Sequence, residues 1–226
     1  MTESARIAKL IDHAVLHPTA TDSDVRAGAE LSIRMNIAAF CVHSKSVSTV
    51  RDVLDGSDVS LAAVVGFPHG NIATAIKQAE ADHAISEGAR EIDMVVDIGA
   101  ACAGNWERVG ADIRAMNRTV VDQDAILKVI FETAYLDESR IIELCEICSD
   151  IGVGYVKTST GFAGAGATIE HVTLMRRHTP PRMGLKASGG IRTLADLEAM
   201  VAAGATRIGT SSTAAILKAV RESTHP

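Results

Sequence analysis

Two lysines stand alone in short apolar segments of this sequence. Lys157 lies in G-Y-V-K-T-S-T-G-F (154–162), and Lys186 lies in G-L-K-A-S-G-G (184–190). An ammonium group is almost never buried without a purpose, and a second cation nearby lowers the pKa of an amine toward the free base that attacks carbonyl groups. The two segments therefore predict an enzyme that works through a Schiff base.

Two glycine-rich segments predict a site for an anion. They are S-G-G-I-R-T (188–193) and I-G-T-S-S-T (208–213). Glycine lets backbone N–H groups approach an anion, a following helix adds the positive end of its dipole, and Arg192, Ser211 and Ser212 can donate hydrogen bonds. We expect a phosphate group to bind here, with simple turn formation as the alternative.

The composition excludes several classes of protein. Hydrophobic residues make up 47% of the 226 residues but aromatic residues only 3%, so the core is aliphatic, which favours alternating strands and helices over a β-sandwich. A formal net charge of −6 argues against a nucleic-acid surface. The N-terminal segment has no signal-peptide pattern, and no apolar segment approaches the roughly 18 residues of a membrane span. We therefore expect a cytoplasmic enzyme with no membrane partner.

A strand-like segment followed by a helical pattern recurs along the chain. The eight expected strands cover residues 10–16, 37–42, 61–67, 91–98, 126–132, 154–160, 184–189 and 207–211. Helical spacing marks segments that include 71–87, 106–121, 138–150, 193–203 and 212–221. The expected helix caps include Asp22, Asn71, Asn105, Asp137 and Thr193. No linker divides the chain, so we expect one domain over residues 1–226.

Eight such units predict a closed (β/α)8 TIM barrel. An open doubly wound sheet is the alternative, because the same local pattern serves both folds. Alternate residues of a strand share a face, so Lys128 is expected on the same face as Glu132. If these faces turn inward, four ionisable side chains point toward one mouth of the barrel: Asp93, Lys128, Lys157 and Lys186.

The expected sixth and seventh strands carry the two lysines side by side. Neighbouring strands lie about 4.8 Å apart, so Lys157 and Lys186 can meet, and mutual repulsion would keep one of them neutral near pH 7. Asp93 would balance the other ammonium and relay protons. The alternative is that the lysines end in salt bridges at the rim. Asp12 has either a direct role or a structural hydrogen bond.

Cysteines and histidines show no metal-binding pattern. Cys145 and Cys148 form C-E-I-C inside an amphipathic helical segment (141–150), and no second pair completes a zinc site, so we expect them to pack against a neighbouring helix. Two further cysteines are expected as buried thiols: Cys41 and Cys102. Four histidines lie near strand ends without ligand spacing: His13, His17, His43 and His69. We predict no metal and no cofactor.

Taken together, the motifs resemble the deoxyribose-phosphate aldolases in their shorter bacterial form. The resemblance runs along nearly the whole chain, and V-K-T-S-T-G together with K-A-S-G-G-I-R is its most specific part. The other motifs are I-D-H-A-V-L, A-F-C-V-H, G-F-P-H-G, E-I-D-M-V-V-D-I-G, L-K-V-I-F-E-T and G-T-S-S. The resemblance implies a metal-free class I aldolase of deoxyribonucleoside catabolism, which interconverts 2-deoxy-D-ribose 5-phosphate with acetaldehyde and D-glyceraldehyde 3-phosphate.

The resemblance also implies roles for individual residues. Lys157 would form the Schiff base, Lys186 would lower its pKa, and Asp93 would transfer protons. A supporting polar network would include Lys128, Asp12 and Thr158. The phosphate would be held by Gly161, Gly189, Gly190, Arg192, Gly209, Ser211 and Ser212. We also expect a homo-oligomer, with a dimer favoured.

The sequence departs from some members of this family at two places. Phe162 stands where some longer members carry a lysine that helps to bind phosphate, so phosphate binding would rest more on Arg192 and on backbone groups. The sequence ends in R-E-S-T-H-P with no tyrosine after Tyr155, whereas some members use a C-terminal tyrosine in proton exchange. That exchange would then rely on Asp93, water or another group.

Two other functions fit the same residues. One is another lysine-dependent aldolase or a transaldolase with a different donor substrate. The other is a barrel that binds a sugar phosphate without catalysis, in which ligand binding would not require Lys157.

Overall fold

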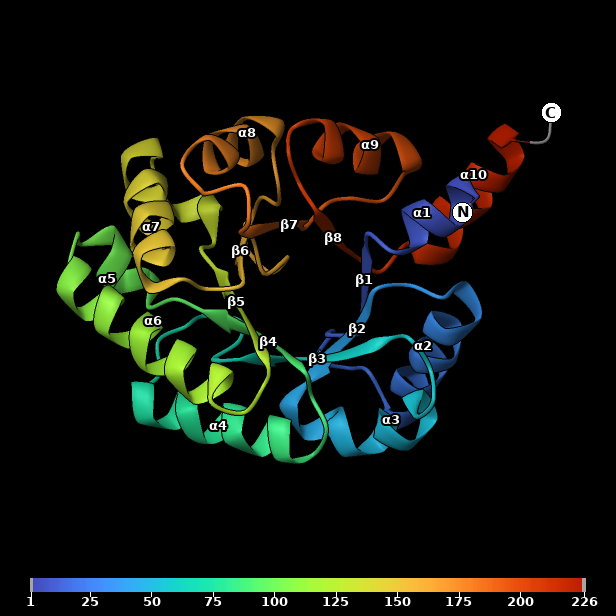
Figure 1. Ribbon diagram of the computed structural model, residues 1–226, viewed down its shortest axis with the longest axis horizontal. Coiled ribbons are helices and arrows are strands. Elements are labelled where there is room, and N and C mark those ends of the chain that lie inside the picture. The colour runs from blue at the N-terminus through green and yellow to red at the C-terminus, as the bar shows by residue number, and fades with distance from the viewer. Residues whose placement is uncertain (1, 225–226) are drawn as a thin grey trace.

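The computed structural model describes residues 2–224 and shows eight parallel strands closed into a barrel (Figure 1). The strands follow one another around the barrel in chain order, and β8 pairs with β1. They are β1 (Ile11–Ala14), β2 (Ala39–His43), β3 (Ser60–Val65), β4 (Glu91–Val95), β5 (Ile126–Ile130), β6 (Tyr155–Lys157), β7 (Gly184–Ser188) and β8 (Arg207–Thr210). The predicted (β/α)8 barrel is confirmed, and the alternative prediction of an open doubly wound sheet is wrong.

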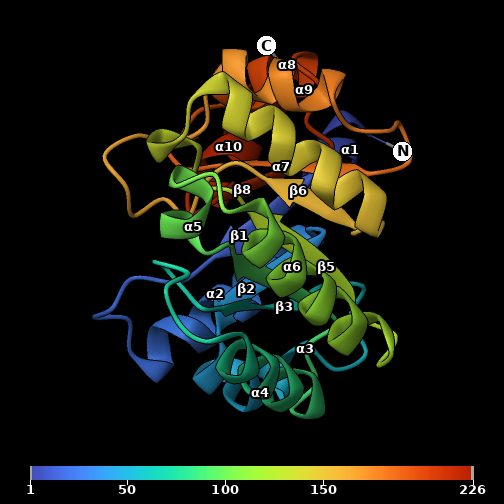
Figure 2. The same ribbon diagram turned by 90° about the vertical axis from the view of Figure 1, so that its left-hand side faces the viewer.

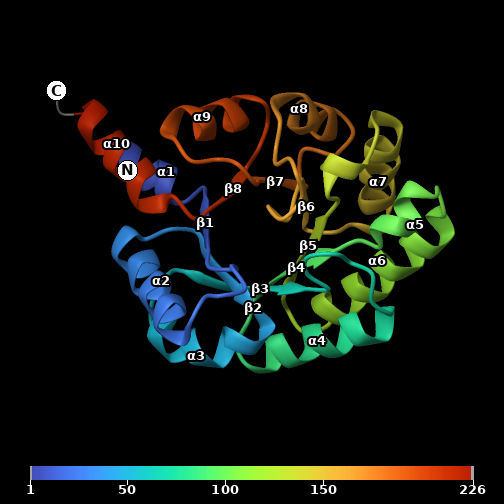
Figure 3. The same cartoon turned by 180° about the vertical axis from the view of Figure 1, so that it is seen from behind.

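Helices surround this barrel on all sides (Figures 1 and 2). They are α1 (Glu3–Ala8), α2 (Asp22–Met35), α3 (Val47–Leu54), α4 (Thr74–Ser86), α5 (Ile98–Cys102), α6 (Trp106–Val121), α7 (Glu138–Ile151), α8 (Ile169–Arg177), α9 (Leu194–Ala202) and α10 (Thr213–Thr224). Figure 3 shows α1 beside α10, so the first and last helices close the ring together. Across residues 2–224, no helix has both the length and the hydropathy that a bilayer span requires.

Helix caps explain most of the predicted helix starts. Three predicted caps are confirmed, each with a side chain that accepts a backbone N–H: Asn105, Asp137 and Thr193. The prediction for Asp22 is wrong by one residue, because Thr21 caps α2 in a capping box. The prediction for Asn71 is also wrong. Gly70 turns the chain at φ 69°, and the backbone is still extended at Ala73, so α4 begins only at Thr74.

The cysteines of the C-E-I-C segment are buried in α7, where the Cys145 thiol donates to the Met175 carbonyl of α8 at 3.9 Å. The prediction of helix packing is confirmed. The Cys41 thiol is also buried, as predicted, on β2. The prediction for Cys102 is wrong, since this thiol is only half-buried at the end of α5 and donates to the Tyr135 carbonyl at 3.6 Å.

The two faces of the strands have different chemistry. Outward side chains are aliphatic and pack with the helices into one large core, which hydrophobic burial stabilises. Inside the barrel, β2 and β3 contribute a small apolar cluster that includes Ala39, Cys41, Ala62 and Val64. The other strands bring ionisable side chains inward. The barrel interior is therefore apolar beside β2 and β3 and ionic beside the other strands.

Space for these polar side chains is made by glycine. A Cβ atom on Gly184 would lie 2.1 Å from the Tyr155 ring, which the neighbouring strand β6 places across it. The Arg207 guanidinium lies over the same ring, with its central carbon 5.5 Å from the centre of the Tyr155 ring. Gly184 is therefore the residue that lets an aromatic ring and an arginine fill the amino end of the barrel.

We predict that Gly184→Ala lowers the free energy of unfolding by about 1–3 kcal/mol, because the added methyl group would overlap the Tyr155 ring, which Arg207 covers on one face. Urea denaturation followed by circular dichroism measures this change. Gly164→Ala is the matched control, since nothing lies within 4 Å of its added Cβ, and its unfolding free energy should stay within about 0.5 kcal/mol of the parent. Equal stability of the two variants would contradict the prediction.

Candidate active site

Lys157 and Lys186 meet at a single carboxylate oxygen inside the barrel. They are direct register partners on β6 and β7, and their Nζ atoms lie 2.7 Å and 2.8 Å from Oδ2 of Asp93. The side chains of the two lysines are 4% and 2% exposed, and that of Asp93 is fully buried. The alternative of salt bridges at the barrel rim is therefore wrong.

Four more ionisable side chains extend this cluster: Asp12, Glu91, Lys128 and Arg207. Lys128 Nζ contacts three carboxylates, at 3.1 Å (Asp12), 2.5 Å (Glu91) and 2.9 Å (Asp93). Arg207 contacts Asp12 at 2.6 Å and Glu91 at 3.4 Å. Lys186 also contacts Asp12, at 2.5 Å. Hereafter these four residues with Asp93, Lys157 and Lys186 are called the ionic cluster.

Lys157 has the fewest acidic partners of the four cations in the ionic cluster. Lys128 has three carboxylates within 4 Å, and Lys186 and Arg207 have two each. Within residues 2–224, Asp93 is the one carboxylate that pairs with Lys157, and Lys186 contacts the same Asp93 oxygen. Four cations thus share three carboxylates, and the excess positive charge falls most heavily on Lys157.

The pKa of the Lys157 amine is lowered from its ordinary value of 10.5. Burial is the largest cause, attraction to Asp93 opposes it, and repulsion from Lys186 lowers the pKa further. The expected direction is confirmed. The expected repulsion from Lys186 does lower this pKa, and removal from water, which the prediction did not consider, contributes more.

The charged forms of Lys186, Lys128 and Asp93 are favoured. Burial by itself would lower the pKa of Lys186, but the carboxylates of Asp12 and Asp93 outweigh it and raise that pKa. Burial would also lower the pKa of Lys128, which its carboxylate partners hold well above the ordinary value. Burial would raise the pKa of Asp93, yet the three lysines hold it well below its usual range. Lys157 is thus the lysine of the ionic cluster that is most easily neutral.

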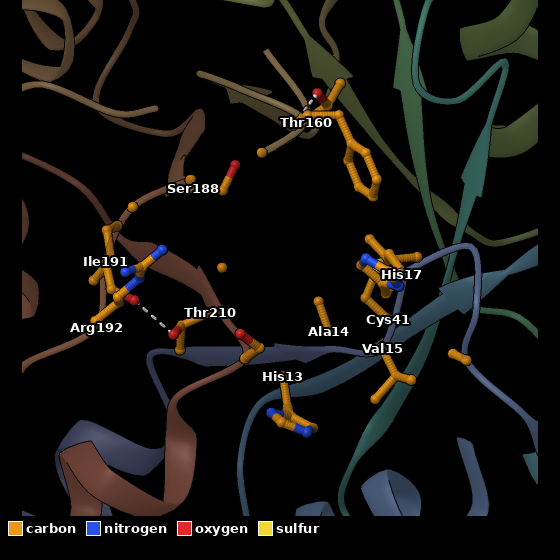
Figure 4. A pocket seen from close by; sticks show the side chains of 18 of the residues that line it. His13, Ala14, Val15, His17, Cys41, Thr160, Ser188, Ile191, Arg192 and Thr210 are labelled. Carbon is orange, nitrogen blue, oxygen red and sulfur yellow. Dashed lines mark hydrogen bonds between the residues drawn. The ribbon is translucent and has the colours of Figure 1, made fainter. Parts of the chain in front are cut away.

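A cavity of about 600 Å³ opens at the carboxyl ends of the strands, and both Lys157 and Lys186 line it. Figure 4 shows Ser188, Arg192 and Thr210 on one side of the opening, with His17 and Cys41 on the opposite side. This end of the barrel is where active sites form in TIM-barrel enzymes. A substrate entering the cavity would reach the amine of Lys157.

Most of the predicted phosphate residues lie in the wall of this cavity: Gly161, Gly189, Gly190, Arg192, Gly209 and Ser211. Ser212 is not among the lining residues, and its N–H donates to the Thr210 hydroxyl at 2.9 Å. Gly209 also makes space for the lysine, since a Cβ there would lie 3.1 Å from Cε of Lys186. The loops after β7 and β8 therefore meet beside the reactive amine.

The predicted supporting residues separate into two groups. Asp12 and Lys128 belong to the ionic cluster, below the cavity and without lining it. Thr158 does not belong to it. Its hydroxyl donates to the Ser188 carbonyl at 3.2 Å and accepts the Ser188 N–H at 3.1 Å. Thr158 thus ties β6 to β7, and its predicted place in the polar network is wrong because its side chain alternates away from that of Lys157.

Glu132 lies beyond the end of the strand that carries Lys128, whereas the prediction placed both residues in one strand. Strand β5 ends at Ile130, and Glu132 adopts a left-handed backbone with φ 56°. Its carboxylate accepts the Thr160 N–H at 3.2 Å and the Thr160 hydroxyl. Burial raises the pKa of Glu132. Glu132 therefore holds the start of the loop that carries Gly161.

Sequence reasoning missed several residues of the site. Arg207 and Glu91 each open a strand, where a charged residue is easily taken for a solvent-exposed end. Cys41 lines the cavity from the apolar half of the barrel, and burial raises the pKa of its thiol to about 11. Burial lowers the pKa of His13, another lining residue, to about 4. Both of these groups are therefore neutral near pH 7.

Phe162 forms an apolar part of the cavity wall. It is 46% exposed, and its ring meets that of Phe67 edge to face at 5.3 Å. Phe67 in turn meets His43 at 5.8 Å. The G-F-P-H-G turn after β3 therefore supports the loop after β6, and position 162 adds an aromatic ring, not a cation, to the cavity wall.

Comparison with known proteins identifies relatives over nearly the whole chain. The deoxyribose-phosphate aldolase of Deinococcus radiodurans is 46% identical over 205 residues, covering 91% of this chain and 92% of that protein. The deoxyribose-phosphate aldolase of Micrococcus luteus is 44% identical over 220 residues, covering 95% and 96%.

Solved structures agree with these relatives. The structure described as QR15, an aldolase, superposes with a TM-score of 0.91 at 35% identity, covering 96% of this chain and 97% of the other. The deoxyribose phosphate aldolase of Aeropyrum pernix, described as a unique tetrameric structure, gives 0.91 at 29% identity, covering 97% and 92%. The family model for DeoC/LacD family aldolases matches residues 6–219. Together with the buried lysine pair, these matches show that the chain belongs to the DeoC/LacD family of aldolases.

Proposed function

We propose that this chain is a deoxyribose-phosphate aldolase, which reversibly cleaves 2-deoxy-D-ribose 5-phosphate to acetaldehyde and D-glyceraldehyde 3-phosphate. The activity is named by relatives at 40–46% identity. The geometry that carries the proposal is the sharing of one Asp93 oxygen by two buried lysines beside the cavity. That arrangement supplies a neutral amine and an acid–base group within reach of it.

In the proposed mechanism, the neutral amine of Lys157 attacks the C1 aldehyde of the open-chain sugar phosphate. Loss of water gives an iminium ion, which acts as an electron sink. Asp93, directly or through water, accepts the proton of the C3 hydroxyl, and the electrons of the C2–C3 bond move toward the iminium. Glyceraldehyde 3-phosphate leaves, the resulting enamine is protonated, and hydrolysis releases acetaldehyde and the free amine.

Lys186 holds Asp93 in place and keeps a positive charge beside Lys157. Its ammonium contacts both Asp12 and Asp93, so it is fixed by two carboxylates while its charge opposes protonation of the Lys157 amine. Lys128 contacts the other oxygen of Asp93, Oδ1, and the same Asp12 oxygen as Lys186. The two aspartates are thus kept ionised even when the Lys157 amine is neutral.

The phosphate end of the substrate lies in the loops after β6, β7 and β8. Gly161, Gly189 and Gly190 have φ values of 88°, 85° and 80°. Residues with a side chain rarely adopt this backbone conformation, which changes the directions of the backbone N–H groups. Arg192 adds a positive charge at the same side of the opening (Figure 4). Backbone N–H groups and one guanidinium therefore supply the recognition of phosphate.

We also propose that the enzyme acts in the cytoplasm and forms a homo-oligomer, with a dimer favoured. The relative from Aeropyrum pernix is described as tetrameric, which makes association of copies of this chain a reasonable expectation. Sedimentation equilibrium measures the assembly, and a purely monomeric protein at all concentrations would contradict it.

Trapping of the imine tests the proposed function directly. Acetaldehyde with borohydride should attach a two-carbon adduct to Lys157, located by peptide mass spectrometry, because this amine is the most easily neutral lysine of the ionic cluster. Lys157→Met should abolish both the adduct and turnover. An adduct on Lys186 would reverse the two assignments, and preference for dihydroxyacetone phosphate as donor would identify a different aldolase.

The pH dependence of the Lys157 adduct tests the role of Lys186. Removing this cation in Lys186→Met removes a repulsion that lowers the pKa of Lys157. Because the neutral amine reacts, the rate of adduct formation should rise with pH, with its midpoint about 1 pH unit higher than in the parent. The rate of cyanoborohydride trapping against pH measures the midpoint. A midpoint that stays in place or falls would contradict this role.

Arg192 is predicted to bind the substrate phosphate. Arg192→Gln should raise KM for deoxyribose 5-phosphate by about tenfold or more, since hydrogen bonds to charged groups contribute about 1.5–3 kcal/mol. Turnover of unphosphorylated deoxyribose should change little. Arg177→Gln, on the exposed face of α8, is the matched control. Equal losses with both substrates would contradict the prediction.

A further inference from the structure

Two members of the ionic cluster, Arg207 and Glu91, lie away from the cavity. Arg207 is the first residue of β8 and Glu91 the first residue of β4, so both lie at the amino end of the barrel. Neither lines the cavity. Their side chains are 13% and 5% exposed. They are therefore too far down the barrel to touch a substrate held at its carboxyl end.

Arg207 is held in a fixed position at this end. Its guanidinium spans Asp12 at 2.6 Å and Glu91 at 3.4 Å, and it lies over the Tyr155 ring. Gly184 leaves the space that this ring occupies. A buried charge with two carboxylate partners and an aromatic face is strongly constrained, so it acts on its surroundings as a fixed charge.

Direct contacts connect this end of the barrel to Lys157. One path runs from Arg207 through Asp12 and Lys186 to Asp93, with contacts of 2.6, 2.5 and 2.8 Å. A second path runs from Glu91 through Lys128 to Asp93, at 2.5 and 2.9 Å. Both paths end at the carboxylate that pairs with Lys157 at 2.7 Å. Neither path passes through exposed side chains, so solvent screens it weakly.

We propose that Arg207 and Glu91 are positioning residues of opposite effect, which together set the charge of the Lys157 amine from the far end of the barrel. This inference rests on the proposed function, because the neutral amine of Lys157 is the reacting group. Arg207 draws Asp12 toward the amino end and adds to the positive charge of the ionic cluster. Glu91 pairs with Lys128 and offsets part of the positive charge of the ionic cluster.

The other groups that face Lys157 are the same in each variant of the test. They come from every element around it: Asp93 on β4, Lys128 on β5, Glu132 after β5, Lys186 on β7, Asp12 and His13 on β1, and Cys41 on β2. His13 and Cys41 have pKa values of about 4 and 11 and are neutral between these values. A difference between variants therefore reports the altered charge.

The proposal predicts that substitutions of Arg207 and Glu91 shift the pH midpoint of adduct formation on Lys157 in opposite directions. Glu91→Gln leaves four cations with two carboxylates, so protonation of Lys157 becomes harder and its midpoint moves to lower pH. Arg207→Gln leaves three cations with three carboxylates, so protonation becomes easier and the midpoint moves to higher pH. A unit charge roughly 10 Å away inside a protein shifts a pKa by about 1 unit, and we expect shifts of about this size.

The experiment measures the rate of cyanoborohydride trapping of acetaldehyde on Lys157 against pH, by peptide mass spectrometry, in the full-length chain. The variants are Glu91→Gln, Arg207→Gln, the double variant and Arg207→Lys. The double variant should return near the parent midpoint, because its charges balance as in the parent, and Arg207→Lys should stay near it because the charge is kept. Circular dichroism verifies folding, and Arg207→Met replaces Arg207→Gln if the latter does not fold.

Opposite shifts with recovery in the double variant support the proposal. Loss of rate in both single variants at an unchanged midpoint would overturn it, because a purely structural role predicts that result, and shifts in the same direction would overturn it as well. Glu30→Gln and Arg34→Gln, an exposed pair on α2, should leave the midpoint in place. Absence of any adduct in the parent would overturn the proposed function itself, whereas an adduct with unmoved midpoints overturns this inference alone.

Discussion

The unequal sharing of three carboxylates by four cations is the constraint on which the site depends. Buried ion pairs gain little stability in themselves, because desolvation opposes their attraction. Their value here lies in the distribution of partners. Lys128 is surrounded by acids, Lys186 and Arg207 have two each, and Lys157 shares a single oxygen with another lysine. The positive charge left over makes the protonated form of Lys157 the least favourable of the three ammonium groups of the ionic cluster, which is the condition for an amine to act as a nucleophile near neutral pH.

The barrel makes this distribution possible because its strands place charged side chains at defined heights. The apolar cluster on β2 and β3 fills its side of the interior with small side chains, so the charged side chains of the other strands pack among themselves. Gly184 and Gly209 remove side chains where Tyr155 and Lys186 need space. The aliphatic layer between strands and helices keeps the strands in register, and with them the spacing of the ion pairs.

The same geometry separates charge control from substrate recognition. The carboxylates of the ionic cluster lie below the cavity, whereas the cavity wall combines the amines of Lys157 and Lys186 with glycine backbone, hydroxyl groups, Arg192 and the apolar ring of Phe162. The substrate phosphate can therefore be recognised without adding a lysine close to the reacting amine. The aldolase family to which the chain belongs combines an aldehyde-binding amine with a phosphorylated substrate, and this separation serves both requirements.

The sequence by itself determined the barrel, the inward face of Lys128, Lys157 and Lys186, and the glycine loops, because strand alternation and turn chemistry are local properties. It did not reveal that Arg207 and Glu91 belong to the ionic cluster, that Thr158 ties two strands together, or that Glu132 lies past the end of its strand at φ 56° and bonds to Thr160. These outcomes depend on which side chains meet across the barrel, and residues more than 100 positions apart, such as Asp12 and Lys128, are brought together only by closure. Tertiary structure also decided that burial, rather than repulsion, is the main cause of the lowered pKa of Lys157, since desolvation depends on everything packed around the amine.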